Sequence, residues 1–70
     1  MELEVKFDGH EIIVTRPGTD MLMSYRKAAA GSNLILTRSR PTVSSPELSE
    51  FRAHGFQAAV SKARELGWIV

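Results

Sequence analysis

Three arginines have the chemistry and the positions for an anion-binding site. Arg16 follows one alternating apolar stretch, and Arg38 and Arg40 close another, just before Pro41 and a serine-rich helix start. If strands adjacent in sequence pair with each other, the three guanidinium groups share the side of the sheet near the helix N-terminus. Guanidinium groups and free helix N–H groups both favour phosphate. The pattern therefore predicts binding of an anion or of a nucleic-acid backbone as one hypothesis.

The same arginines also have a purely structural interpretation, which is the stronger of the two. Asp20, Glu47 and Glu50 lie close enough in the sequence to neutralise them. Charged side chains on an edge strand also hinder edge-to-edge aggregation. Solvated or ion-paired arginines therefore explain the pattern without a ligand.

Three aliphatic residues predict a second kind of site, a contact surface. Ile13, Leu22 and Ile35 are expected on the sheet face that a single helix leaves uncovered, separated by small Thr and Ser residues. An apolar centre with a polar margin is typical of a subunit interface, although scattered exposed aliphatics are also ordinary. We expect this face to form a homodimer, or to bind another protein.

The sequence contains no residue set that predicts catalysis. There is no cysteine, and His10 and His54 are far apart and lack a cluster of supporting metal ligands. No nucleophile and base, paired carboxylates or glycine-rich phosphate loop stand at a motif spacing. We expect no enzymatic activity, no metal and no cofactor.

Four strands and a helix must position these residues. Alternating apolar and charged residues over 2–7 predict the first strand, and Asp8-Gly9 predicts a two-residue turn that pairs Phe7 with His10. A second strand follows over 10–15.

A second turn, over 17–20, pairs Arg16 with Met21 and opens a third strand over 21–27. After a looser connection over 28–33, we expect a short fourth strand over 34–39. Its core residues are expected to be Leu34 and Leu36.

The remaining residues predict one long helix. Ser44 or Ser45 is a suitable N-cap, Pro46 fits the first turn, and Gly67 is the expected stop after Leu66. Tyr25 and Trp68 are expected in the core rather than as platforms for stacked bases. Seven residues form a broad apolar face at helical spacing: Leu48, Phe51, Phe56, Ala59, Val60, Ala63 and Leu66.

The chain as a whole is expected to be one α+β domain over residues 1–70, a four-stranded antiparallel β-meander followed by a long C-terminal helix on one face. A chain of 70 residues has room for one domain with a marginal core, which favours support from a second subunit. The net charge of +1 does not single out nucleic acid as a partner. No apolar run is long enough to span a membrane, and the lack of a leader and of cysteine predicts a cytoplasmic protein.

Two segments resemble parts of small uncharacterised bacterial proteins. They are Phe7-Asp8-Gly9-His10 and residues 62–70. This resemblance implies a bacterial protein and carries no activity with it. The order of four strands and a helix is also similar to that of certain dimeric coactivator domains that bind single-stranded DNA, an analogy of topology alone.

Overall fold

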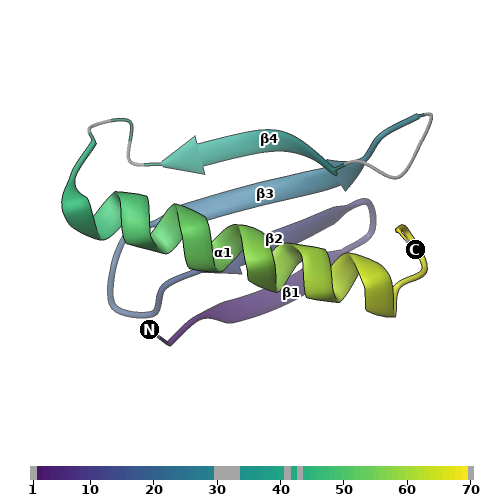
Figure 1. Cartoon of the computed structure of the whole chain (residues 1–70), viewed down its shortest axis with the longest axis horizontal. Coiled ribbons are helices and arrows are strands. Elements are labelled where there is room, and N and C mark those ends of the chain that lie inside the picture. The colour runs from purple at the N-terminus through teal and green to yellow at the C-terminus, as the bar shows by residue number, and fades with distance from the viewer. Residues whose placement is uncertain (1, 30–33, 41, 43, 70) are drawn as a thin grey trace.

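The structure, a computed structural model, describes residues 2–29, 34–40, 42 and 44–69. Its strands form one antiparallel sheet in the order β1-β2-β3-β4, and a helix follows them (Figure 1). The predicted α+β meander with a C-terminal helix is confirmed. The elements are β1 (Glu4–Asp8), β2 (Glu11–Thr15), β3 (Leu22–Lys27), β4 (Leu34–Arg40) and α1 (Pro46–Glu65).

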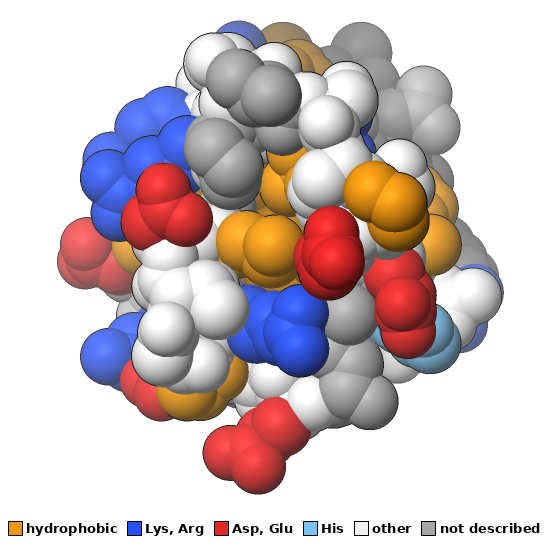
Figure 2. All heavy atoms as spheres, turned by 90° about the vertical axis from the view of Figure 1, so that its left-hand side faces the viewer, with side chains coloured by type: hydrophobic (Ala, Val, Ile, Leu, Met, Phe, Trp, Pro, Cys, Tyr) orange, Lys and Arg blue, Asp and Glu red, His pale blue; other side chains and the backbone are white. Residues whose placement is uncertain are grey.

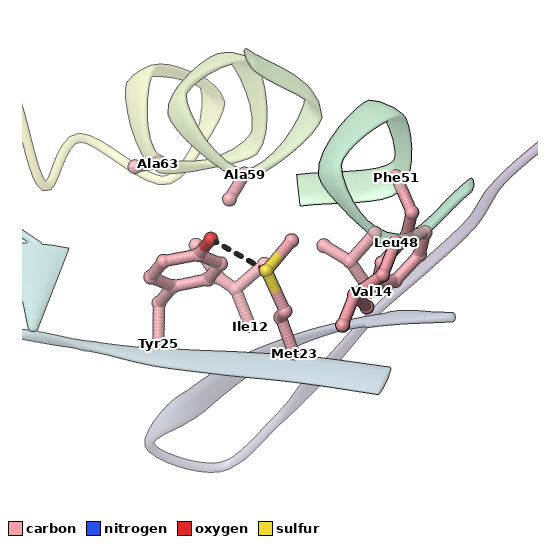
Figure 3. Close-up of a cluster of buried hydrophobic side chains, with 8 residues drawn as sticks. All are labelled: Ile12, Val14, Met23, Tyr25, Leu48, Phe51, Ala59 and Ala63. Carbon is pink, nitrogen blue, oxygen red and sulfur yellow. Dashed lines mark hydrogen bonds between the residues drawn. The ribbon is translucent and has the colours of Figure 1, made fainter. Parts of the chain in front are cut away.

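The helix covers only part of the sheet. It packs mainly on β2 and contacts β1 and β3 at its margins, whereas β4 lies beyond it (Figure 1). One helix is roughly as wide as two strands, because its diameter of about 10 Å compares with a strand spacing of about 4.8 Å. The buried core consequently lies between α1 and the strands β2 and β3 (Figure 3): Ile12, Val14, Met23, Tyr25, Leu48, Phe51, Ala59 and Ala63.

Both ends of α1 are closed by hydrogen bonds that the sequence predicts. The hydroxyl of Ser45, the N-cap, accepts a bond of 3.1 Å from the Leu48 N–H, and Pro46 occupies the first turn. At the other end Gly67 has a φ of +79°, and the Gly67 and Trp68 N–H groups donate to carbonyls of the last turn. This pattern is a Schellman motif, which holds Trp68 against the core.

The first hairpin has a different register from the one predicted. Phe7 lies opposite Ile12 rather than His10, and the loop consists of Gly9 and His10. Only the first loop position has a positive φ, +61° at Gly9, so the turn does not need Asp8 in a left-handed conformation. The register moves by two residues, and the same side chains therefore face the core. His10 is an exposed turn residue, not the first residue of the second strand as predicted.

The second hairpin has the predicted register. Val14 lies opposite Met23, Ile12 lies opposite Tyr25, and the Arg16 N–H donates to the Met21 carbonyl at 3.3 Å. The expected connection over 28–33 lies partly outside the described residues, and Pro41 lies wholly outside them.

A β-bulge interrupts the pairing of β3 with β4. Ser24 pairs with Arg38 whereas Tyr25 pairs with Leu36, which leaves Thr37 as an extra residue in β4. One extra residue reverses the side on which all later residues of the strand point. The part of β4 after Thr37 therefore presents the opposite faces to those predicted from simple alternation.

Candidate interaction surfaces

The predicted cluster of three arginines does not form on one face. Arg38 and Arg40 lie opposite Ser24 and Leu22, which places them on the outer face of the sheet, away from α1. Arg16 continues β2 on the side of Val14, the side that faces the helix. The bulge at Thr37 is the physical reason for this correction.

At the end of the molecule where α1 begins, the described residues also form no single basic surface. Figure 2 shows this end, and its Lys and Arg side chains stand in separate groups with acidic side chains between them. The helix N-terminus therefore has no continuous ring of guanidinium groups on this face.

A closed ring of hydrogen bonds occupies the centre of the outer face. Arg38 Nε donates to Ser24 Oγ at 3.3 Å, the Ser24 and Thr37 hydroxyls are 2.8 Å apart, and Thr37 Oγ1 donates to Glu11 Oε1 at 3.2 Å. Arg38 Nη2 closes the ring on Glu11 Oε2 at 3.5 Å. Every link can be given one donor and one acceptor, so fully buried Ser24 is satisfied on a face that no other described element covers.

The charges of the outer face are divided between its two halves. The β1–β2 half carries three carboxylates and one ammonium group, and the β3–β4 half carries three guanidinium groups. The predicted interface residues Ile13, Leu22 and Ile35 lie between these charges, the first two partly buried and the third exposed. The charged residues are Glu4, Lys6, Asp8 and Glu11 in the first half, and Arg26, Arg38 and Arg40 in the second.

A shallow depression of about 370 Å³ lies in the basic half, beside Leu22 and the residues Thr37 to Arg40. Arg38 is one of the residues that line the depression, and 61% of its side chain is exposed. The depression has room for a side chain from a partner.

The structure also reveals an apolar flank that sequence reasoning missed, formed by Leu36 and Phe56, which both lie next to the buried Tyr25. Leu36, expected in the core, is 52% exposed, and Phe56 is 49% exposed. The rings of Phe56 and Tyr25 are 6.1 Å apart, and Tyr25 is also the cross-strand partner of Leu36. Helical spacing alone counts Phe56 as a core residue; it is exposed because α1 does not reach β4.

The environment of Tyr25 shifts the pKa of its hydroxyl. Burial raises its pKa above the ordinary value of 10.0, and the positive charge of Arg52 partly opposes this rise. Its hydroxyl donates to Met23 Sδ at 3.3 Å (Figure 3). Tyr25 is thus a core residue, as predicted.

Other kinds of site are not seen in the described part of the chain. Its His, Asp and Glu residues form no group of three or more that could hold a metal ion. Within the described ranges, no helix combines the length and apolar character needed to cross a membrane. His54 lies exposed on the polar face of α1.

Comparison of the chain with models of protein families, with curated proteins and with solved structures finds no match. Any proposal on function must therefore start from the surfaces described above.

Proposed function

We propose that the chain is a protein-interaction module that forms a homodimer through the outer face of its sheet. The observation that carries this proposal is the division of that face into an acidic half and a basic half around Ile13, Leu22 and Ile35. Such a face is complementary to a second copy of itself.

The charge pattern also selects the symmetry of the dimer. A two-fold axis parallel to the strands lays β1 over β4 of the second copy, and β2 over β3. One row of residues across the four strands consists of Glu4, Thr15, Leu22 and Arg40. In the dimer this row faces the same row of the second copy in the opposite order, so Glu4 lies opposite Arg40 of the second copy. An axis across the strands would instead lay acidic half on acidic half.

The middle of the face can be buried at limited cost. In this dimer one pair of like charges comes close, Lys6 and Arg38 of the second copy. Each already has an opposite charge within its own chain, because Lys6 is 3.0 Å from Glu4 and Arg38 is 3.5 Å from Glu11. The hydroxyls of the ring already have partners, so covering them breaks no bond to the protein. We expect the aliphatic residues to supply affinity and the charges to fix orientation.

The first test is the solution mass from light scattering. Wild type is expected as a dimer, and Ile13→Lys as a monomer, because the variant buries an unpaired charge at the centre of the interface. Gln57→Lys adds the same charge on the exposed face of α1 and should leave the dimer intact. A dimer mass that is unchanged in Ile13→Lys would refute the outer-face interface.

An exchange of charges tests the symmetry. Glu4→Arg and Arg40→Glu should each weaken the dimer by about tenfold, and the double exchange should restore it, because the two positions meet across the axis. The apolar flank is the other surface that could form the dimer interface. If Phe56→Lys gives a monomer and Ile13→Lys does not, the interface is that flank and the proposal is wrong.

Binding of an anion or nucleic-acid backbone remains the alternative, now with Arg38 and Arg40 but without Arg16. The dimer would cover both guanidinium groups, so a mixed-sequence oligonucleotide should compete with the dimer at low salt and lose at high salt. Arg38→Glu combined with Arg40→Glu should abolish this binding. A salt-resistant dimer that ignores the oligonucleotide would exclude the alternative.

A further inference from the structure

A hollow of about 510 Å³ lies at the end of the sheet opposite to the start of α1. It is bounded by the β1–β2 turn, the end of β3 and the chain just after α1 (Figure 1). This volume is within the range of small-molecule sites, about 300–1,000 Å³. The residues that line it, here called the Trp68 hollow, are Phe7, Gly9, His10, Arg26, Lys27 and Trp68.

Two aromatic rings form one side of the Trp68 hollow. The centroids of Phe7 and Trp68 are 5.7 Å apart at an interplanar angle of 75°, an edge-to-face pair. In this geometry the two rings cover at most one face of each other, so at least one face of each ring is not used by the pair. Phe7 is also 43% exposed, so part of its ring is available to a flat partner.

Cationic groups form the other side. Arg26 and Lys27 are consecutive, exposed residues at the end of β3, and no carboxylate lines the hollow among the described residues. Neither side chain forms an ion pair with another described residue. Gly9 lacks a side chain and has open space around its Cα, so the turn leaves the hollow accessible.

We infer that the Trp68 hollow binds a nucleobase that carries a phosphate group. The base stacks against Phe7 beside Trp68, and Lys27, which lies on the same side of the sheet as Phe7, contacts the phosphate. Stacking of one base on an aromatic side chain contributes about 1–3 kcal/mol, and a guanidinium or ammonium group suits a phosphate. An open hollow with these two features can accept any of the bases, because stacking and phosphate contacts do not distinguish one base from another.

Lys27, the residue on which the ligand test depends, lies outside the proposed dimer interface. Lys27 lies opposite Leu34 on the side of the sheet that faces α1, whereas Arg26 lies on the outer face. Lys27→Glu therefore tests the ligand without changing the dimer face. Fluorescence titration can then refute the ligand site, and solution mass can refute the dimer, each without affecting the other.

The test uses Trp68, the only tryptophan of the chain, as the reporter. Its fluorescence is measured during titration of the full chain with adenosine monophosphate, a short oligodeoxyadenylate and inorganic phosphate. We expect a saturable change with one or both of the first two probes. Tight, steeply salt-dependent binding of the oligonucleotide alone identifies a nucleic-acid strand, whereas equal binding of the monophosphate identifies a free nucleotide.

Variants separate the two halves of the site. Phe7→Leu keeps an apolar residue but removes the ring, and Lys27→Glu reverses the charge; each should weaken binding by about tenfold or more. Arg64→Glu, which changes the net charge by the same amount on the exposed face of α1, should have little effect. The inference is wrong if neither probe changes the fluorescence, if inorganic phosphate reproduces the effect, or if Lys27→Glu and Arg64→Glu behave alike.

Discussion

Ser24 shows how a small polar residue can be buried on a sheet face that no other described element covers. Its neighbours cover it: the extra residue Thr37 brings a hydroxyl within 2.8 Å, and the side chain of Arg38 reaches across it to Glu11. The same contacts engage the guanidinium group of Arg38. A ligand would have to compete with Glu11 for that group, whereas Lys27 at the Trp68 hollow forms no ion pair with another described residue.

Tyr25 supplies a prediction on pH. Burial raises its pKa in the folded state, so the unfolded chain ionises first as the pH rises. Stability is therefore fully present below about pH 10 and falls as the pH rises from there toward the folded-state pKa. Urea unfolding at a series of pH values should show this loss, and Tyr25→Phe should remove it.

The same residue permits a direct check, because it is the only tyrosine of the chain. Its ultraviolet absorbance should titrate above pH 10.0 in the folded protein. Replacing Arg52 with Ala should raise the apparent pKa further, since the opposing positive charge is lost. Titration at the ordinary value would show that Tyr25 is more exposed to water than the structure indicates.

At the scale of the elements, the start of α1 depends on one serine. The Ser45 hydroxyl accepts the Leu48 N–H at 3.1 Å, and Ser44 lies outside the helix. Ser45→Ala should destabilise the fold by about 1 kcal/mol, the usual cost of losing an N-cap, whereas Ser45→Asp should retain most of the stability. Ser44→Ala is the matched control. Equal losses at both positions in urea unfolding would show that the cap is shared.

The sequence predicts the type and order of every element, and the structure corrects how β4 is paired. Alternation and turn residues are local signals, so they predict the strands, the second hairpin and α1 well. A bulge depends on how two strands fit together, and nothing local to Thr37 indicates it. For this reason the faces of Arg38 and Arg40 were wrongly predicted. The exposure of Leu36 and Phe56 depends on the helix path across the sheet, which spacing alone does not determine.

The first hairpin illustrates the same limit on a smaller scale. Asp8-Gly9 and Gly9-His10 both allow a two-residue loop, since Asp-Gly suits a type I′ turn, in which both positions have a positive φ, and Gly at the first position suits a type II′ turn. The two registers bury the same side chains because they differ by two residues. Core patterning therefore cannot distinguish them, and the lining of the Trp68 hollow, which includes Gly9 and His10, could not be predicted from it.

For the whole molecule, one helix on a four-stranded sheet leaves two large surfaces without cover. These are the entire outer face and the flank beside β4 (Figure 1). A chain of 70 residues buries a modest share of its surface, so burial of either face by a second subunit would add substantially to its stability. Self-association and folding should therefore be coupled.

This coupling makes thermal stability depend on protein concentration. If the folded dimer dissociates as it unfolds, a tenfold increase in concentration stabilises each chain by about 0.7 kcal/mol, half of RT ln 10. For a domain of this size that corresponds to a rise in Tm of roughly 3–6 °C. Differential scanning calorimetry over a hundredfold range of concentration measures the effect. Ile13→Lys should abolish the dependence while Gln57→Lys preserves it, because only the former disrupts the outer face. A Tm that is independent of concentration in the wild type would mean that the folded monomer is stable by itself, and the outer face would then be an ordinary solvated surface.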